Sequence, residues 1–244
     1  MPLRRPFLSR RLPRRLSLAR LVARLGLVLG VATVVLAALW WWRPTLLLPG
    51  TRALVMDGGD PYLRALMRTI SASESNVLRP YHVVHGGNVV ASLDQHPNRC
   101  ESIGGGPNRG NCSTAAGRYQ LLYGTWLELA ARHHPDHTDD PMDATRLSFA
   151  PRYQDMVVHA WLADPRAWGM DVAGQLRQGS VQPVLKRLSS AWTSLGYGIE
   201  SNRMSRQLPR IYQDLLRQEL VRAGVDPETG EPKRKDRAAD AGRS

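Results

Sequence analysis

The chain has 244 residues and 43% hydrophobic residues, enough for one sizeable folded domain and an additional segment. Its formal net charge of +12 suggests a polyanion partner, but residues 1–24 hold eight arginines and no acid. Subtracting these eight leaves +4 for everything downstream, so the central domain is only mildly basic. We therefore expect no nucleic-acid partner.

An uncharged stretch, Leu25–Trp42, follows the Arg-rich arm. As a helix its 18 residues would be about 27 Å long, close to the thickness of a bilayer core. Tryptophans end the stretch at residues 40–42, where indole rings favour the lipid–water boundary. These features predict a single-pass anchor in the inner membrane, with residues 1–24 cytoplasmic and the rest periplasmic. A cleaved signal peptide, and an anchor that later leaves the membrane, remain open alternatives.

Prolines and a Gly–Gly pair predict a linker over residues 43–59, before a folded domain over residues 60–225. Asp60 is a good helix N-cap, and Pro61 suits the first helical position. Apolar residues at helical spacing follow, and they predict that one face of this helix is buried. They are Leu63, Leu66, Met67 and Ile70.

A small β-hairpin is predicted over Tyr81–Leu93, where β-prone residues flank Gly86–Gly87. The next loop holds Cys100 and Cys112, and a disulfide is the natural pairing on the oxidising side of a membrane. The remainder of the domain is predicted to be helical, and a polar tail is expected to be disordered. The predicted helices are 117–132, 153–162, shorter ones within 172–192, and 203–223; the tail is 226–244.

Glu74 is the candidate acid. It lies four residues after Ile70 and seven after Met67, which places it on the apolar face if the helix continues. Burial and the negative end of the helix dipole would both raise the pKa of its carboxyl group. A carboxylic acid that stays protonated near neutral pH can protonate a glycosidic oxygen. Position alone favours a surface glutamate just past a helix end.

Several motifs occur in the order found in the lambda-phage endolysin family of lytic transglycosylases (glycoside hydrolase family 104 type), and the chain resembles that family over most of residues 60–220. They are SASES at Ser71–Ser75, YHVVHGG at Tyr81–Gly87, His96–Pro97, AGRYQLL at Ala116–Leu122, FAPRYQD at Phe149–Asp155, WTSL at Trp192–Leu195 and Gly196–Gly198. The arm, the anchor and the tail lie outside the resemblance.

The resemblance implies an α+β, lysozyme-like fold, mostly helical and two-lobed, with Glu74 in a cleft between the lobes. It also implies the reaction, in which Glu74 acts as acid and then as base on the bond between N-acetylmuramic acid and N-acetylglucosamine. The product would carry a 1,6-anhydro end. A hydrolytic lysozyme on the same scaffold and a non-catalytic wall-binding module are the alternatives.

Polar and aromatic residues near the acid are candidates for binding the glycan strand, although core positions remain open for the aromatic ones. They are Ser75, Tyr81, Tyr119, Gln120, Trp192 and Tyr197, with Ser194 as a further hydrogen-bonding neighbour. Arg118 could meet acidic stem peptides or form a structural ion pair. A hydrolase would need a second acid, for which Asp94 and Glu101 are candidates, although solvated loop positions suit both better.

A second polar cluster lies between two predicted helices. His133 and His137 have the spacing of helical zinc ligands, but Pro135 interrupts the helix and no glutamate base is suitably placed. The cluster is therefore interpreted as a polar loop. The sequence predicts neither a metal nor a cofactor.

Overall fold

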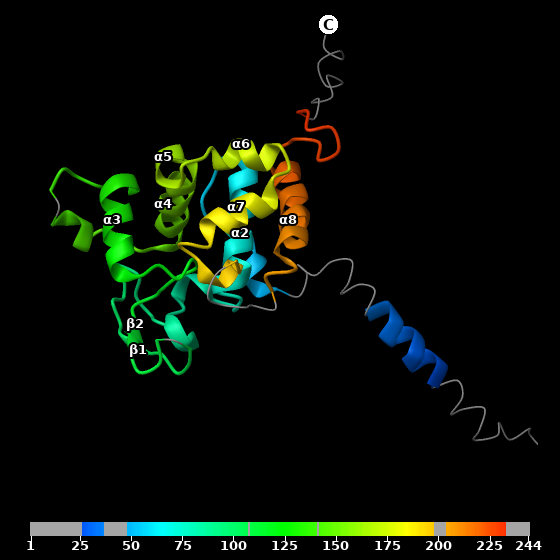
Figure 1. Ribbon diagram of the computed structural model, residues 1–244, viewed down its shortest axis with the longest axis horizontal. Helices are drawn as coiled ribbons and strands as arrows, with labels where there is room; N and C mark the ends of the chain where they lie inside the picture. Colours follow the sequence, from blue (N-terminus) through cyan, green and yellow to red (C-terminus); the bar gives the residue numbers. More distant parts are fainter. Residues whose placement is uncertain (1–25, 37–47, 107, 141, 198–203, 233–244) are drawn as a thin grey trace, which may run out of the picture. The chain divides into compact units, whose positions relative to one another are not determined.

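The computed structural model describes residues 26–36, 48–106, 108–140, 142–197 and 204–232. The chain divides into two compact units, Met1–Pro44 and Thr45–Ser244. The second unit is mostly helical and contains one small antiparallel sheet (Figure 1), in agreement with the predicted α+β class. The predicted arm and residues 233–244 of the predicted tail lie outside the described residues.

In the first unit, residues 26–36 are helical. The rest of the predicted anchor, Leu25 and residues 37–42, lies outside the described residues. Within the ranges that the structure describes, no helix is long and apolar enough to cross a membrane. The anchor stays a prediction.

Residues 48–59, predicted to belong to a linker, differ from that prediction because they pack against the domain. Leu54 and Met56 are buried in the core, and a short 3-10 helix, η2 (Pro49–Thr51), precedes them. Backbone carbonyls of this segment accept hydrogen bonds from buried side chains, as Gly50 does from the hydroxyl of Ser71 at 2.8 Å. Buried polar groups need such partners, so the segment is held in place. Residues 43–47 lie outside the described residues.

Helix α2 (Pro61–Glu74) forms as the sequence predicts. The carboxylate of Asp60 accepts hydrogen bonds from the backbone N–H groups of Tyr62 and Leu63, and Pro61 occupies the first turn. The four predicted apolar residues of its face are buried. The helix packs along α8 (Leu208–Arg222), which lies within the predicted range 203–223.

The predicted hairpin at residues 81–93 is confirmed only in part, because no regular strand forms there. This segment folds into two 3-10 turns, η3 (Pro80–His82) and η4 (His85–Gly87), with one isolated bridge between Val83 and Val89. The strand-like residues also pair with a distant segment, because Val84 bridges Ala116 and the carbonyl of Val83 accepts from the N–H of Gly117. The distant segment thus adds to a short local ladder, in which the N–H groups of Val84 and Val90 donate to the carbonyl oxygens of Asn88 and His82.

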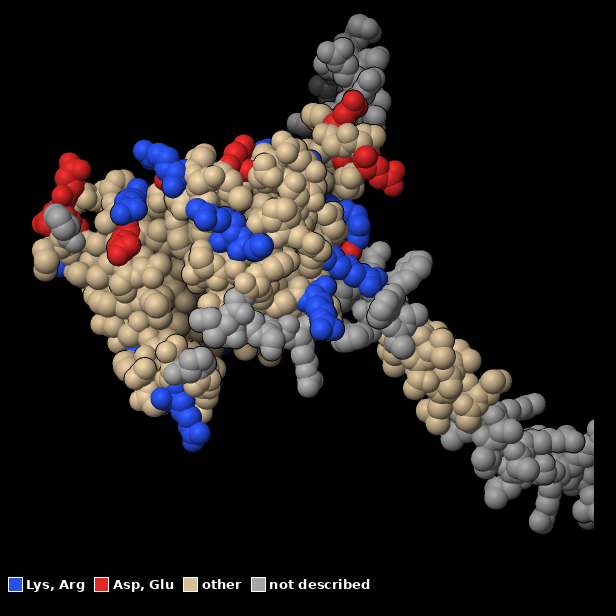
Figure 2. Space-filling model, in the orientation of Figure 1, with Lys and Arg blue, Asp and Glu red and all other residues tan. Residues whose placement is uncertain are grey.

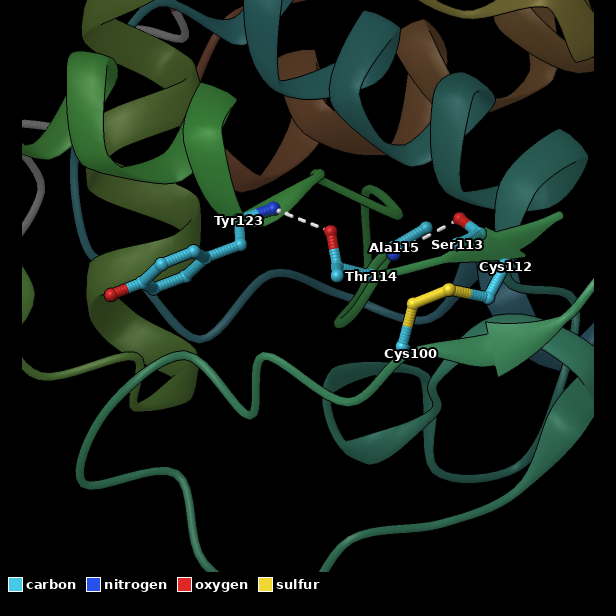
Figure 3. Close-up of a disulfide and its surroundings, with 6 residues drawn as sticks. All are labelled: Cys100, Cys112, Ser113, Thr114, Ala115 and Tyr123. Carbon is cyan, nitrogen blue, oxygen red and sulfur yellow. Dashed lines mark hydrogen bonds between the residues drawn. A yellow bond between two sulfur atoms is a disulfide. The ribbon is translucent and has the colours of Figure 1, made fainter.

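The sheet lies in the cysteine loop, where β1 (Glu101–Ser102) pairs antiparallel with β2 (Cys112–Ser113). The predicted disulfide between Cys100 and Cys112 is confirmed and closes the base of this hairpin (Figure 3), with 5.2 Å between the two Cα atoms. Next to it, the hydroxyl of Thr114 accepts a hydrogen bond from the backbone N–H of Tyr123. The hairpin is therefore joined to the first residue of helix α3 (Tyr123–His133).

Helix α3 begins six residues later than predicted, because Gly117 and Gln120 have positive φ angles of 74° and 46° and form a turn before it. The prediction of a helix over residues 153–162 is confirmed, as is that of shorter helices after residue 172. The remaining elements are η5 (Asp143–Thr145), α4 (Pro151–Ala163), α5 (Pro165–Trp168), α6 (Val172–Arg177), α7 (Val181–Leu188) and η6 (Thr193–Leu195).

Candidate active site

Glu74 is the last residue of α2 and is half-buried. The face below it, formed by Met67 and Ile70, is fully buried, so the helix periodicity turns the carboxyl group towards the edge of the core. The hydrogen-bonded helix ends at Ser75, whose non-helical backbone leads the chain away. Glu74 thus has the position that the sequence predicted, at the end of the first helix of the domain.

Two serines are linked to the carboxyl group of Glu74, one directly and one through the other. The hydroxyl of Ser194, in η6, donates a hydrogen bond to Oε1 of Glu74. The hydroxyl of Ser73 lies 2.7 Å from the hydroxyl oxygen of Ser194 and 2.8 Å from its carbonyl oxygen. This chain of hydroxyl groups joins α2 to a turn 120 residues further along the sequence. Ser194 was a predicted neighbour, whereas Ser73 was missed, although it stands next to Glu74 in the SASES motif.

The turn that carries Ser194 is closely packed. Gly196 follows it with a φ angle of 87°, and a Cβ atom at that position would lie 2.7 Å from the hydroxyl of Ser205. Only glycine combines this backbone conformation with such close approach. On the other side, Leu195 is fully buried. The position of the Ser194 hydroxyl is therefore defined by the fold.

Tyr81 and Tyr119 do not face a sugar, contrary to the prediction. Tyr119 has an exposed fraction of 0%, and its hydroxyl donates to Oδ1 of Asp155 at 2.5 Å. The hydroxyl of Tyr81 donates to Oδ2 of the same carboxylate at 2.7 Å. Burial, followed by the charge of Asp155, raises the pKa of Tyr119, so its phenol remains a donor. Both rings belong to the core.

Arg118 is fully buried as well, so it cannot reach a stem peptide. Its guanidinium donates to the hydroxyl of Tyr81 at 2.8 Å and to the carbonyl oxygen of Gly50 at 3.0 Å. It also donates to the carbonyl oxygens of Arg52 and Ala53. Arg118 therefore has the structural role that the sequence left open, with backbone carbonyls as its main partners.

Ser75 and Trp192 are also part of the interior. The hydroxyl of Ser75 donates to the carbonyl oxygen of Arg118 at 2.6 Å. The indole N–H of Trp192 donates to the carbonyl oxygen of Tyr119 at 2.9 Å, and its ring packs against that of Trp161 at 5.1 Å. Neither side chain is available to a glycan strand, because both are buried.

Two predicted binding residues reach the surface. Tyr197 is 50% exposed and follows η6. Gln120 is partly buried, and its side-chain N–H₂ group donates to the carbonyl oxygens of Gly117 and Val83 at 3.0 and 3.2 Å. These bonds leave the side-chain oxygen of Gln120 as an acceptor.

The two candidate second acids are engaged by other side chains. Asp94 is exposed and accepts a hydrogen bond from the hydroxyl of Ser92 at 2.8 Å. Glu101 forms an ion pair with Arg99 at 2.7 Å and accepts from Asn88. The contacts of Asp94 agree with its interpretation as a solvated loop residue, whereas Glu101 is the first residue of β1 and is only partly exposed.

The histidine cluster forms a capped loop after α3. The ring of His134 bonds the carbonyl oxygen of Ser148 and stacks on Tyr153 at 4.2 Å. Burial lowers the pKa of His134, which keeps its ring neutral. Across the residues that the structure describes, no group of three or more His, Cys, Asp or Glu side chains is arranged to hold a metal ion.

One comparison with known proteins, against family models, agrees with the motifs. A family model described as endolysin matches residues 64–217, more than half of the chain. Among solved structures, a bacteriophage lambda lysozyme complexed with a chitohexasaccharide matches with a TM-score of 0.48 and 21% sequence identity. That match covers 66% of this chain and 97% of the lysozyme chain. No sequence among the curated proteins matches.

Proposed function

This chain belongs to the endolysin family, whose members degrade peptidoglycan, and we propose that it is a lytic transglycosylase with Glu74 as its acid and base. Its substrate would be the β-1,4 bond between N-acetylmuramic acid and N-acetylglucosamine. The observation that supports this proposal is the half-buried carboxyl group of Glu74, held by the hydroxyl of Ser194 at the end of a core helix.

One carboxyl group can serve both steps of this reaction. Protonated Glu74 would give its proton to the bridging oxygen, and the bond from that oxygen to C1 of the muramic acid would break. The C6 hydroxyl of the same sugar would then bond to C1 and return a proton to Glu74. The products are a strand with a free hydroxyl group and a strand with a 1,6-anhydro end. No water is consumed, and the acid is regenerated.

The engagement of Asp94 and Glu101 by other side chains favours this single-acid reaction over hydrolysis. A hydrolase uses a second carboxylate about 5 to 9 Å from the first, either as a nucleophile or to activate water. Asp94 is exposed and bound to Ser92, while Glu101 is paired with Arg99. A hydrolytic lysozyme remains the second candidate for the chemistry.

Tyr197 and Gln120 are the residues proposed to contact the glycan strand. The exposed ring of Tyr197 offers an apolar face and a polar edge, which suit a pyranose ring. The side-chain oxygen of Gln120 could accept the N–H of a sugar acetamido group. Four further residues proposed from the sequence would act only indirectly, by supporting the site from the core: Ser75, Tyr81, Tyr119 and Trp192.

Replacing Glu74 with glutamine tests the role of the acid, because the amide keeps the shape but cannot donate a proton as an acid. We expect the Glu74→Gln protein to clear purified cell walls about 10³-fold more slowly than the parent, within the range for loss of a general acid–base group. Glu128→Gln, on the exposed surface of α3, is the matched control and should clear walls at the parental rate. Equal rates for parent and Glu74→Gln would contradict the assignment, and would favour a non-catalytic wall-binding module if both were inactive.

Mass spectrometry of the released fragments distinguishes the two reactions. Anhydro ends are expected from a transglycosylase, whereas reducing ends heavier by one water would show hydrolysis. Because both reactions can use Glu74, this measurement is independent of the glutamine substitution.

The place of action is proposed from the sequence. The Arg-rich residues 1–24 and the uncharged stretch Leu25–Trp42 would hold the catalytic domain on the periplasmic side of the inner membrane. Alkaline extraction of isolated membranes would leave an anchored chain in the pellet. Recovery of a chain that begins after residue 42 would instead indicate cleavage.

A further inference from the structure

A surface hollow with a volume of about 620 Å³ lies between the end of α7 and the segment after it. Its lining combines two cations, three hydroxyl groups and one aromatic ring. These residues are Lys186, Arg187, Ser189, Ser190, Thr193 and Tyr197. Figure 2 shows Lys and Arg side chains over α7 on the face in view. A hollow of this size can hold a small polar ligand or several residues of a peptide.

The two cations of the hollow are available to an anion. Lys186 and Arg187 are exposed, and neither forms an ion pair with a carboxylate of the residues that the structure describes. Arg187 is held in place because its Nε–H group donates to the carbonyl oxygen of Trp168. Its terminal N–H groups remain for a ligand, since an arginine carries five donors.

The hydroxyl groups of the hollow suit a peptide. The hydroxyls of Ser189 and Ser190 donate back to the carbonyl oxygens of Lys186 and Arg187, at 2.7 and 3.0 Å. Their oxygen atoms therefore keep acceptor capacity, which the N–H groups of a peptide could use. The hollow thus offers cations that can bind the carboxylates of a peptide and hydroxyl oxygens that can accept hydrogen bonds from its N–H groups.

The hollow adjoins the candidate active site. Thr193, which lines it, is the first residue of η6, and the next residue, Ser194, donates to the carboxyl group of Glu74. The two sites therefore share one turn of the chain, in which a residue that lines the hollow is bonded directly to the residue that contacts the acid. Tyr197, the proposed sugar contact, lines the same hollow.

We infer that this hollow binds the carboxylates of the stem peptides carried by the muramic acid residues, an inference that rests on the proposed function. Stem peptides project from the glycan strand and bear several carboxylates, whereas the sugars around the cleaved bond are neutral. Cations without a carboxylate partner, in a hollow that shares a turn with the active site, would therefore select peptide-bearing strands. This is the role that Arg118, buried in the core, cannot fill.

A purely structural role for the two cations is the competing explanation. Lys186 and Arg187 lie in the last turn of α7, where positive charges complement the helix dipole. Arg132 has the same position on α3 and Arg146 is another exposed cation, and both lie outside the hollow. Substituting Arg132 and Arg146 therefore removes the same net charge as substituting Lys186 and Arg187, but outside the hollow.

The test compares two substrates that differ only in charge. One is soluble, uncross-linked glycan strands with intact stem peptides; the other is the same strands after their carboxylates have been converted to amides. The full-length parent should cleave the charged strands with a kcat/KM about fivefold higher, the size expected for two solvent-exposed charge contacts. The Lys186→Gln/Arg187→Gln protein should lose this preference, while its rate on the amidated strands stays parental. The preference of the parent should also shrink in high salt.

The control variant is Arg132→Gln/Arg146→Gln, which should retain the parental preference. Equal rates of the parent on both substrates, or a parental preference in Lys186→Gln/Arg187→Gln, would overturn the inference while leaving the muralytic activity in place. Failure of the parent to cleave either substrate would overturn the proposed function instead, and the inference with it.

Discussion

Two carboxylates of this protein, Asp155 and Glu74, lie in contrasting surroundings. Asp155 is fully buried and accepts four hydrogen bonds, from the hydroxyls of Tyr81 and Tyr119 and from the backbone N–H groups of Val55 and Met56. Glu74 is half-buried at a helix end and accepts from the hydroxyl of Ser194. The first carboxylate is surrounded by donors from three distant segments, whereas the second lies at the surface.

The contrast shows that some family motifs stabilise the core, whereas others position the acid. Several motif residues that have suitable chemistry for binding sugars, such as Tyr119 and Arg118, serve the buried carboxylate and the segment before α2. The acid is instead positioned by small serine side chains. We therefore expect substitutions at the buried group to change the free energy of unfolding, and substitutions around Glu74 to change turnover.

Asp155→Asn should have the largest effect on stability. Its amide group cannot accept four hydrogen bonds, so buried N–H and O–H donors and the nearby charge of Arg118 lose their partner. The free energy of unfolding in urea should fall by about 3 to 5 kcal/mol. Asp139→Asn, at an exposed loop position, is the matched control and should unfold like the parent. An unchanged unfolding midpoint for Asp155→Asn would refute the structural role of this carboxylate.

Glu219 is another buried carboxylate, and it makes the stability of the protein depend on pH. It pairs with Arg64 and Arg68 at 2.7 Å each, and all three side chains are buried. Burial raises the pKa of Glu219, but the hydrogen bonds and charges of Arg64 and Arg68 outweigh it, so the net pKa lies below the ordinary 4.5. The resulting stability is present above pH 4.5 and is lost as the pH falls through the lower folded value.

Glu219→Gln should therefore be less stable than the parent at pH 7, by about 3 kcal/mol for a broken buried ion pair. The difference should narrow as the pH falls below 4.5, because the parent then loses the ionised carboxylate as well. Urea unfolding between pH 7 and pH 3 measures this, with exposed Glu128→Gln as the control. A difference that stays constant over this range would argue against the lowered pKa.

The smallest expected effect separates two serines that lie near Glu74. Ser194→Ala removes the hydroxyl that donates to Glu74, so kcat should fall about tenfold, which corresponds to one hydrogen bond of about 1.4 kcal/mol. The free energy of unfolding should stay nearly unchanged. Ser194→Thr keeps a hydroxyl and should restore part of the rate. Ser75→Ala removes a buried bond to Arg118, so it should lower stability by about 1 kcal/mol and leave kcat unchanged. A lower kcat for Ser75→Ala with a lower stability for Ser194→Ala would contradict both assignments.

Much of the local structure could be predicted from the sequence. The Asp60 cap, Pro61 and the apolar residues of α2 predicted where this helix begins and which face is buried. Helical spacing also predicted that Glu74 ends this face, and the two cysteines predicted their disulfide. The helix features depend on residues that are neighbours in the chain, and two cysteines can form only one disulfide. A sequence pattern is therefore sufficient to predict them.

Other features depend on partners that are distant in the sequence. The run from Tyr81 to Val90 has the composition of a hairpin and keeps two local ladder bonds, but it also pairs with residues 115–117. Residues 48–56 have the composition of a linker, yet their backbone groups are partners for Arg118 and Asp155. Neither pairing leaves a local signal, because a hydrogen bond between remote segments is set by packing.

The sequence by itself determined the helical framework, the family and the residue that ends the first helix of the domain. Only the tertiary structure decided which aromatic and charged side chains are buried. Tyr119 and Tyr197 have the same chemistry and stand in similar motifs, but one is enclosed by α4 and the other lies at the surface. Burial depends on which distant elements cover a side chain, and that is a property of the packed molecule rather than of its neighbours in the chain.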